Sequence, residues 1–405
     1  MYKQIYKLLL FTALATLLGS CVRDNYECPE PGPTRVLLAY VGTDNNLNGL
    51  EQEKIQGLRD GWTGNPNDRI IVYRDARGAD ARLMEISNLG PNEQPREIAT
   101  YPNGGSGQTE TAVAAAEMGN SASAATLARV IADVIGMFPD ADSYGLLVFS
   151  HASGWLPQGA LANPMLPAAG RPRADSRSVI VDGTQEMQLS DFAAAIPEGL
   201  FDYIVFETCF MAGIEVAYEL RHKAEHILAS SAEIVDPGFA PVYTSATAML
   251  MEQDLAGFGQ RVIDHTLTYA ENSPQRSATC SVINTAGLEA LAAFVKANCD
   301  LARAVDIADI QRFDRLSAAT LFFDLGDYYS RLLDTEGQRS ELSRLIANCI
   351  EWKAATAGFM NQASGNNGFA ITKHSGLTAY IPQPALSGLN EAYALTQWAR
   401  AVSPD

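Results

Sequence analysis

Two residues that could act together in hydrolysis each follow a short apolar run. His151 comes directly after the run at 144–150, and Cys209 comes two polar residues after the run at 201–206. A thiolate can attack a carbonyl carbon, and an imidazolium can protonate the leaving group. The pattern therefore indicates a Cys-His pair, although a small buried cysteine and a hydrogen-bonded histidine would produce the same pattern.

The segments around these residues predict an α/β fold. Apolar runs alternate with helical patterns, as in a sheet with helices on its faces. The predicted strands are 35–41, 69–73, 81–86, 144–150 and 201–206, and the polar stretch 88–107 is predicted to be a loop. Continuous apolar runs suit parallel strands buried on both faces. Functional groups gather beyond the carboxyl ends of such strands, so we expect His151 and Cys209 in one crevice.

Apolar positions at helical spacing predict the helices. Residues 121–137 and 210–223 carry such a pattern, and the second segment would place Cys209 beside a helix N-terminus, which lowers a thiol pKa. Further helices are expected at 288–302, 340–355 and 389–402. We therefore expect a core domain at 34–284 and an α-rich C-terminal extension at 285–405 packed on it.

The N-terminus has the composition of an export signal. Residues 1–7 contain two lysines and no acids, residues 8–18 are almost entirely apolar, and small residues precede Cys21. The segment resembles the lipobox of bacterial lipoproteins, which implies a signal peptide at 1–20 and a diacylated Cys21. The proline-rich stretch 21–33 suits a tether. We expect an exported, lipid-anchored protein of the cell envelope, in the Gram-negative outer membrane; an ordinary secretory signal is the alternative.

Composition narrows the classes of partner. The 405 residues are 47% hydrophobic and carry a formal net charge of −18, which disfavours nucleic acid and anionic membrane surfaces as partners. The six cysteines include no CxxC pair, so we expect no zinc or thioredoxin-type site and no metal ligands. Lipidation of Cys21 would leave five cysteines, an odd number, so at least one thiol would stay free.

Five segments together resemble the clostripain family of cysteine peptidases, whose fold is related to that of caspases and gingipains. They are 151–155 (HASGW), 207–220 (ETCFMAGIEVAYEL), 227–238 with its ILASSAE and PG, 322–325 (FFDL) and 375–382 (SGLTAYIP). The resemblance spans about residues 35–385, and its specificity lies mainly around His151 and Cys209. It implies a caspase-like, mostly parallel sheet with helices on both faces.

The resemblance makes Cys209 the nucleophile and His151 its acid–base partner. It also assigns the backbone N–H groups of Cys209 and Ala152 to the oxyanion hole. The family usually has glycine where this chain has Ala152, and a positive φ there would strain the site. This departure keeps open an alternative, a catalytically silent surface lipoprotein that binds peptide or glycan.

The resemblance also implies specificity for basic residues. The family commonly has aspartate two residues before the nucleophile, in a pocket for lysine or arginine, and this chain has Glu207 there. We therefore expect a peptide or protein substrate cut after Arg or Lys; a helix-capping role for Glu207 is the alternative. Ser230 and Ser231, in a matching downstream segment, are further candidates for substrate binding.

Two regulatory features are implied as well. Relatives can be activated by cleavage between the histidine and the cysteine, and the loop 160–178 contains Arg171, Arg173 and Arg177, so self-cleavage there is expected.

No cofactor is expected to be required. Calcium is a possible ligand because it is associated with some relatives. Acidic residues lie at predicted strand ends, but no DxDxDG calcium loop is present. These residues are Asp44, Asp75 and Asp182.

Overall fold

A computed structural model describes residues 34–90, 93–102, 119–165, 179–360 and 367–403. The part of the chain from Thr34 to Asp405 forms one compact unit. Its described residues build a sheet covered by helices, and the sheet continues into the predicted extension, because a strand at 350–355 joins it.

Among the described residues, nine strands form this sheet, in the order β12-β10-β9-β8-β5-β1-β2-β3-β4. The five central strands run parallel to one another, and antiparallel strands extend the sheet at both edges. The parallel strands are β9 (Ala224–Ala229), β8 (Phe201–Glu207), β5 (Ser143–Phe149), β1 (Arg35–Thr43) and β2 (Asp68–Ala76). The edge strands are β12 (Ile350–Ala355), β10 (Thr279–Asn284), β3 (Ala81–Glu85) and β4 (Arg96–Tyr101).

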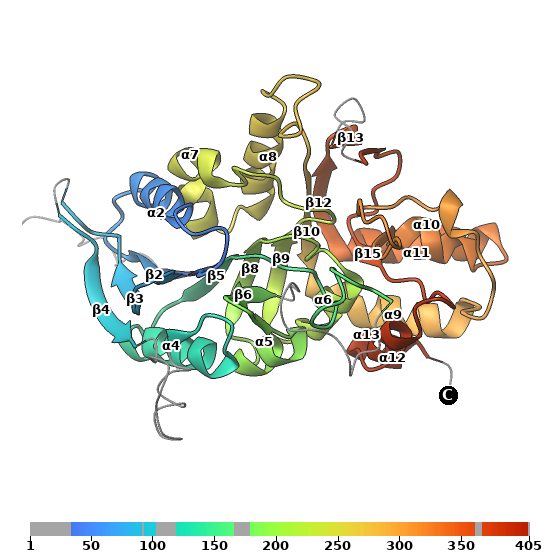
Figure 1. Ribbon diagram of the computed structural model, residues 1–405, viewed down its shortest axis with the longest axis horizontal. Coiled ribbons are helices and arrows are strands. Elements are labelled where there is room, and N and C mark those ends of the chain that lie inside the picture. Colours follow the sequence, from blue (N-terminus) through green and yellow to red (C-terminus); the bar gives the residue numbers. More distant parts are fainter. Residues whose placement is uncertain (1–33, 91–92, 103–118, 166–178, 361–366, 404–405) are drawn as a thin grey trace, which may run out of the picture. The chain divides into compact units, whose positions relative to one another are not determined.

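Helices cover both faces of the sheet, which confirms the predicted fold class (Figure 1). One face carries α2 (Glu51–Asp60), α7 (Ala240–Met251) and α8 (Leu255–Thr266). The other carries α4 (Ala124–Met137), α5 (Leu189–Ala195), α6 (Ile214–Glu219), α9 (Leu288–Asn298) and α13 (Gln397–Val402). Strand β1 shows why two cores form: Leu37 and Ala39 pack in one, and Leu38 and Tyr40 in the other.

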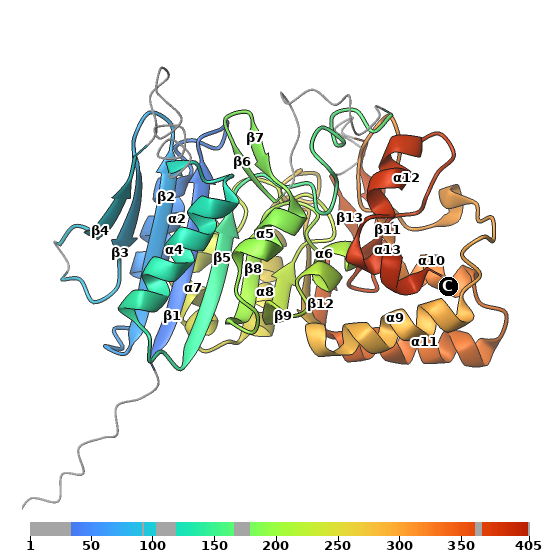
Figure 2. The same cartoon turned by 90° about the horizontal axis from the view of Figure 1, so that it is seen from below.

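The remaining elements lie mostly in the C-terminal third of the chain. They are the hairpin β6 (Ile180–Asp182) and β7 (Gln185–Met187), the pairs β11 (Phe323–Asp324) with β15 (Thr378–Ala379) and β13 (Gly358–Phe359) with β14 (Phe369–Ala370), and the helices α10 (Leu325–Arg331), α11 (Glu336–Cys349) and α12 (Ser387–Tyr393). In Figure 2 the β6–β7 hairpin projects at the carboxyl end of the parallel strands.

Four of the predicted elements were wrong in type or length. The predicted loop 88–107 contains β4, an exposed edge strand whose few apolar residues hid its pattern. The predicted helix 340–355 ends at Cys349, and β12 follows because Trp352 packs on the sheet core. The predicted helix 389–402 is broken into α12 and α13. The predicted helix 210–223 is only α6, because residues 208–213 form turns.

Candidate active site

The sheet register places His151 and Cys209 at equivalent positions. Phe149 of β5 lies opposite Glu207 of β8, and each candidate follows its strand partner by two residues. Both are half-buried and line one cavity of about 290 Å³. The prediction that one crevice brings these two residues together is therefore confirmed.

The turn after β8 is held by backbone hydrogen bonds. The N–H of Phe210 donates to the carbonyl oxygen of Ala232 at 3.0 Å, and the N–H of Ala212 donates to that of Ser230 at 2.9 Å. Phe210 has a φ of 63°, a left-handed conformation that is uncommon outside glycine. Because α6 begins only at Ile214, Cys209 lies in this turn and not at the helix N-terminus, contrary to our expectation.

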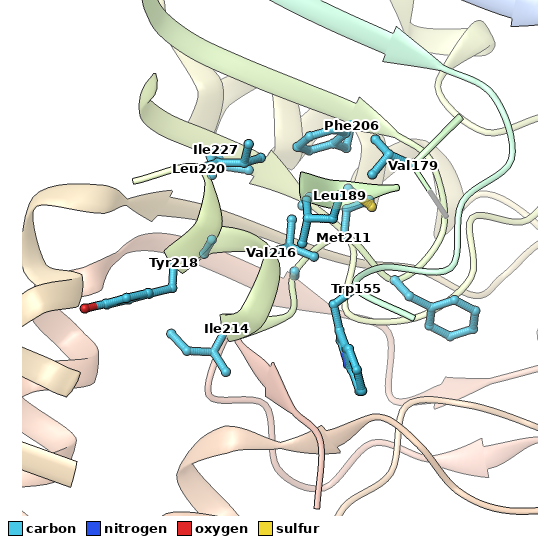
Figure 3. Close-up of a cluster of buried hydrophobic side chains, with 14 of the residues drawn as sticks. Trp155, Val179, Leu189, Phe206, Met211, Ile214, Val216, Tyr218, Leu220 and Ile227 are labelled. Carbon is cyan, nitrogen blue, oxygen red and sulfur yellow. The ribbon is translucent and has the colours of Figure 1, made fainter. Parts of the chain in front are cut away.

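Packing beneath the turn holds it in place. Figure 3 shows Met211, Ile214 and Val216 in a buried cluster with Phe206 of β8 and Trp155. The ring of Phe210 stacks on that of Phe322 with centroids 4.3 Å apart. Gly154 has a φ of 65°, and a Cβ there would lie 2.7 Å from the Phe210 carbonyl oxygen, so only glycine fits.

Each catalytic candidate has a hydrogen-bond partner that orients it. The Cys209 Sγ accepts a hydrogen bond from the Ile234 N–H at 3.3 Å, and a thiolate accepts such a bond more strongly than a thiol. The His151 Nε2 lies in hydrogen-bond contact with the Asn46 Oδ1. An amide oxygen only accepts, so Nε2 is the donor in this contact. Sequence reasoning missed Asn46, which lies a few residues beyond the predicted strand 35–41.

The backbone at Ala152 shows no strain. Ala152 is 1% exposed and is not among the residues with positive φ. The backbone strain that would have favoured a catalytically silent binding protein is therefore absent. Within the described ranges, no hydrogen bond from the Ala152 N–H is found. The oxyanion role of Ala152 and Cys209 stays a prediction.

Glu207 lies on the floor of the cavity, and its carboxylate already has protein partners. The residue is 2% exposed and forms an ion pair with Lys54 of α2. Its Oε1 also accepts from the Phe239 N–H at 2.6 Å, and its Oε2 accepts from the Tyr243 hydroxyl at 2.5 Å. It does not cap the following helix, which begins seven residues later. A substrate-binding role for Glu207 stays a prediction.

Ser230 and Ser231 do not line this cavity. The Ser230 hydroxyl hydrogen-bonds to the Thr279 hydroxyl at 2.8 Å, and the Ser231 hydroxyl contacts the His374 Nε2 at 3.4 Å. Burial and Lys353 lower the pKa of His374 to about 4, so this histidine is neutral. Both serines are buried, and the backbone carbonyl of Ser230 holds the nucleophile turn through the Ala212 N–H.

The other acidic residues of the cavity lie on the loop 233–239. Glu233 is paired with Arg315 at 2.7 Å. Asp236 is exposed, and among the residues that the structure describes no ion pair to it is found. The lining therefore contains three carboxylates, of which two already have a cationic partner, and Asp236 carries the remaining negative charge.

The other described cysteines are poor nucleophiles. Burial raises the pKa of Cys280 and of Cys299 to about 12 and that of Cys349 to about 11. All four described cysteines, Cys209 included, are free thiols. Cys209 is the one that opens onto the cavity with His151.

Two of the acidic residues considered for calcium, Asp75 and Asp182, share a proton. The Ser121 N–H donates to the Asp182 Oδ2 at 2.7 Å and to the Asp75 Oδ2 at 3.0 Å. Burial, the hydrogen bond to Asp75 and its negative charge raise the pKa of Asp182 to about 8. In the described part of the chain no group of three or more histidine, cysteine or acidic side chains could hold a metal ion. Calcium binding at these acidic residues stays a prediction.

The shared proton should make stability fall as pH rises. The folded chain keeps the proton on Asp182 up to about pH 8, whereas in the unfolded chain the pKa of this carboxyl is near its ordinary value of 3.8. Between these values the folded state binds more protons, so ionisation of Asp182 destabilises it. We expect Asp182→Asn to reduce the loss of stability between pH 5 and 8 in urea unfolding, whereas exposed Asp191→Asn should leave it unchanged. An unaltered slope in Asp182→Asn would contradict the shared proton.

Several predicted positions lie outside the described residues. They are Cys21 and the signal and tether segments, and the self-cleavage candidates Arg171, Arg173 and Arg177. In the described ranges, no helix is long and apolar enough to span a bilayer.

Comparison with known proteins identifies the family. The model of the clostripain family of C11 peptidases matches residues 39–359. An inactive zymogen C11 protease from Parabacteroides distasonis is 28% identical, with a TM-score of 0.74 over 91% of this chain and 98% of that one. A secreted C11 cysteine protease from Bacteroides thetaiotaomicron is 19% identical, with a TM-score of 0.73 over 93% of this chain and 100% of that one.

A second structure of a secreted Bacteroides thetaiotaomicron C11 protease, in complex with an irreversible peptide inhibitor, is 22% identical, with a TM-score of 0.68 over 92% of this chain and 99% of that one. No curated protein matches the chain. The family model covers most of the chain, and the likeness to solved C11 proteases extends over almost the whole of it. The chain therefore belongs to the clostripain family of cysteine peptidases.

Proposed function

We propose that this chain is an endopeptidase that uses Cys209 as nucleophile, His151 as acid–base partner, and cleaves after basic residues. The observation that carries this proposal is the cavity that both residues line at matching positions beyond β5 and β8. The high pKa values of the other described thiols leave Cys209 as the plausible nucleophile among them.

In the proposed reaction, His151 Nδ1 takes the proton from the Cys209 thiol. The thiolate attacks the scissile carbonyl carbon, and the backbone N–H groups of Ala152 and Cys209 bind the developing oxyanion. The imidazolium then protonates the leaving amine as the C–N bond breaks. A water molecule, deprotonated by His151, hydrolyses the thioester and releases the free thiol. Asn46 is the residue that holds the imidazole in the required tautomer.

The charge of the cavity supports a preference for a basic residue. Of its three carboxylates, Glu207 and Glu233 are paired with Lys54 and Arg315, which leaves the charge of Asp236 to attract a substrate cation. Asp236 is exposed at the cavity, so an arginine or lysine side chain could reach it without displacing a protein group.

A panel of fluorogenic peptides with Arg, Lys, Asp or Leu before the reporter tests this function. We expect faster cleavage after Arg and Lys than after Asp and Leu, and we expect Asp236→Asn to lower kcat/KM for the Arg and Lys peptides by about tenfold. Exposed Asp191→Asn is the matched control and should have no effect. Hydrolysis of no peptide would refute the endopeptidase, and equal rates on Arg and Leu peptides would refute the basic preference.

Asn46 should control the pH dependence of the reaction as a positioning residue. Asn46→Ala removes the acceptor of the His151 Nε2 proton, and we expect kcat/KM to fall about tenfold. Asn46→Asp places a negative charge beside the ring, which favours the imidazolium and should move the acidic limb of the pH–rate profile upward by about one unit. If neither variant changes the profile, Asn46 does not orient His151.

Processing and anchoring complete the proposal. The 28% identical relative is an inactive zymogen, which supports activation by cleavage of this chain after Arg171, Arg173 or Arg177. Intact-mass analysis should find two fragments in wild-type protein and one intact chain in Cys209→Ala; a single species in both would contradict self-cleavage.

The N-terminal motif supports export and lipid anchoring through Cys21 in the outer membrane, so Cys21→Ser should prevent incorporation of labelled palmitate.

A further inference from the structure

The pair formed by Lys54 and Glu207 lies at the floor of the proposed substrate cavity. Lys54 is on the first turns of α2, 153 residues before Glu207 in the sequence, and it is 4% exposed. Both side chains line the cavity with Cys209. The Lys54 ammonium thus lies beside the Glu207 carboxylate, where the family resemblance places the basic side chain of a substrate.

The Lys54 ammonium has three partners among the described residues. It binds the Glu207 Oε1, it donates to the Pro237 carbonyl oxygen at 3.3 Å, and it lies 4.2 Å from the centre of the Phe149 ring. An ammonium group has three N–H donors and no acceptor. Lys54 is therefore fixed in place by a carboxylate, a carbonyl and an aromatic face.

The carboxylate of Glu207 is equally committed. Its oxygens also accept from the Phe239 N–H and the Tyr243 hydroxyl. The loop comes so close that a Cβ on Gly238 would lie 2.5 Å from the Glu207 Oε1. A second cation on this carboxylate would leave one buried positive charge uncompensated, which is unfavourable in a desolvated site.

We propose that Lys54 neutralises Glu207, so that the floor of the substrate cavity does not select for charge. Selection for a basic substrate residue then depends on the exposed Asp236 and not on the buried Glu207. This inference rests on the proposed peptidase function. It predicts that the floor of the substrate cavity carries no net charge and accepts apolar as well as basic side chains.

The test compares Arg and Leu peptides with the full chain, its Lys54→Met/Glu207→Gln double variant, and Asp236→Asn. The double variant removes both charges and keeps similar volumes. We expect its Arg-to-Leu ratio of kcat/KM to stay within about twofold of wild type, whereas Asp236→Asn lowers the ratio about tenfold. A fall of the ratio in the double variant comparable to that in Asp236→Asn would overturn the inference. Wild-type protein that cleaves nothing would instead refute the proposed function.

A measurement on wild-type protein covers the case in which the double variant does not fold. Acetylation with N-hydroxysuccinimidyl acetate followed by peptide mass analysis reports the accessibility of the Lys54 amine, with and without a peptide aldehyde ending in arginine. We expect Lys54 to stay protected in both samples, with exposed Lys296 as the labelled reference. Labelling of Lys54 on addition of the aldehyde would show that substrate displaces it from Glu207, and would overturn the inference.

Discussion

Cys209→Ala is expected to abolish peptide hydrolysis, with a loss in kcat of about 10⁴-fold or more. The substitution removes the only atom proposed to bond covalently to the substrate. His151→Ala should cause a similar loss, and the double variant should be little worse than either, because nucleophile and base act as a unit. Single-turnover assays with the preferred basic peptide measure this effect.

Cys280→Ala is the matched control for this prediction. Cys280 is a buried thiol whose pKa is raised to about 12, and it lies outside the cavity. We expect Cys280→Ala to keep normal catalytic rates, although some stability is lost with the sulfur. Activity retained in Cys209→Ala, or lost equally in Cys280→Ala, would exclude Cys209 as the nucleophile.

Lys54→Met is expected to lower the free energy of unfolding by about 3–5 kcal/mol. The substitution leaves the Glu207 carboxylate buried without its cation, although the hydrogen bonds from Phe239 and Tyr243 remain. Adding Glu207→Gln removes the uncompensated charge, so the double variant should recover most of this loss. Urea unfolding at neutral pH of the wild type, Lys54→Met, Glu207→Gln and the double variant gives the full double-mutant cycle.

An exposed pair provides the comparison. Arg129 and Asp133 lie one turn apart on α4, and the Arg129 side chain is 61% exposed. Arg129→Met should change stability far less than Lys54→Met, because surface pairs are screened by solvent. If Lys54→Met were as mild as Arg129→Met, the Lys54–Glu207 pair would not be a buried, mutually dependent unit.

Local sequence patterns predicted the elements that carry the catalytic candidates. The apolar runs before His151 and Cys209 correspond to β5 and β8, because strands buried on both faces have to be apolar throughout. Edge strands lack this constraint, which explains why β4 was taken for a loop and β12 for a continuing helix. The nucleophile turn was missed because Phe210 adopts positive φ only under the constraint of its neighbours.

Partners distant in sequence could not be predicted in the same way. Asn46 reaches His151 across 105 residues, and Lys54 reaches Glu207 across 153. Neither residue stands out locally: Asn46 belongs to a polar loop, and Lys54 to a helix with charged residues on several sides. Their roles follow from the parallel order of β1, β5 and β8, which brings the loop after β1 to the carboxyl ends of the other two strands.

The loop 233–239 contributes both to the reactivity of the Cys209 sulfur and to the charge of the substrate cavity. Through Ile234 it donates a hydrogen bond to the nucleophilic sulfur, through Phe239 it holds the floor carboxylate, and at Asp236 it presents the unpaired charge. A change of length or backbone in this loop would therefore alter sulfur reactivity together with substrate choice. Attempts to redirect the enzyme to new peptides should accordingly keep this backbone and vary the facing residues of α2 and the loop after β1.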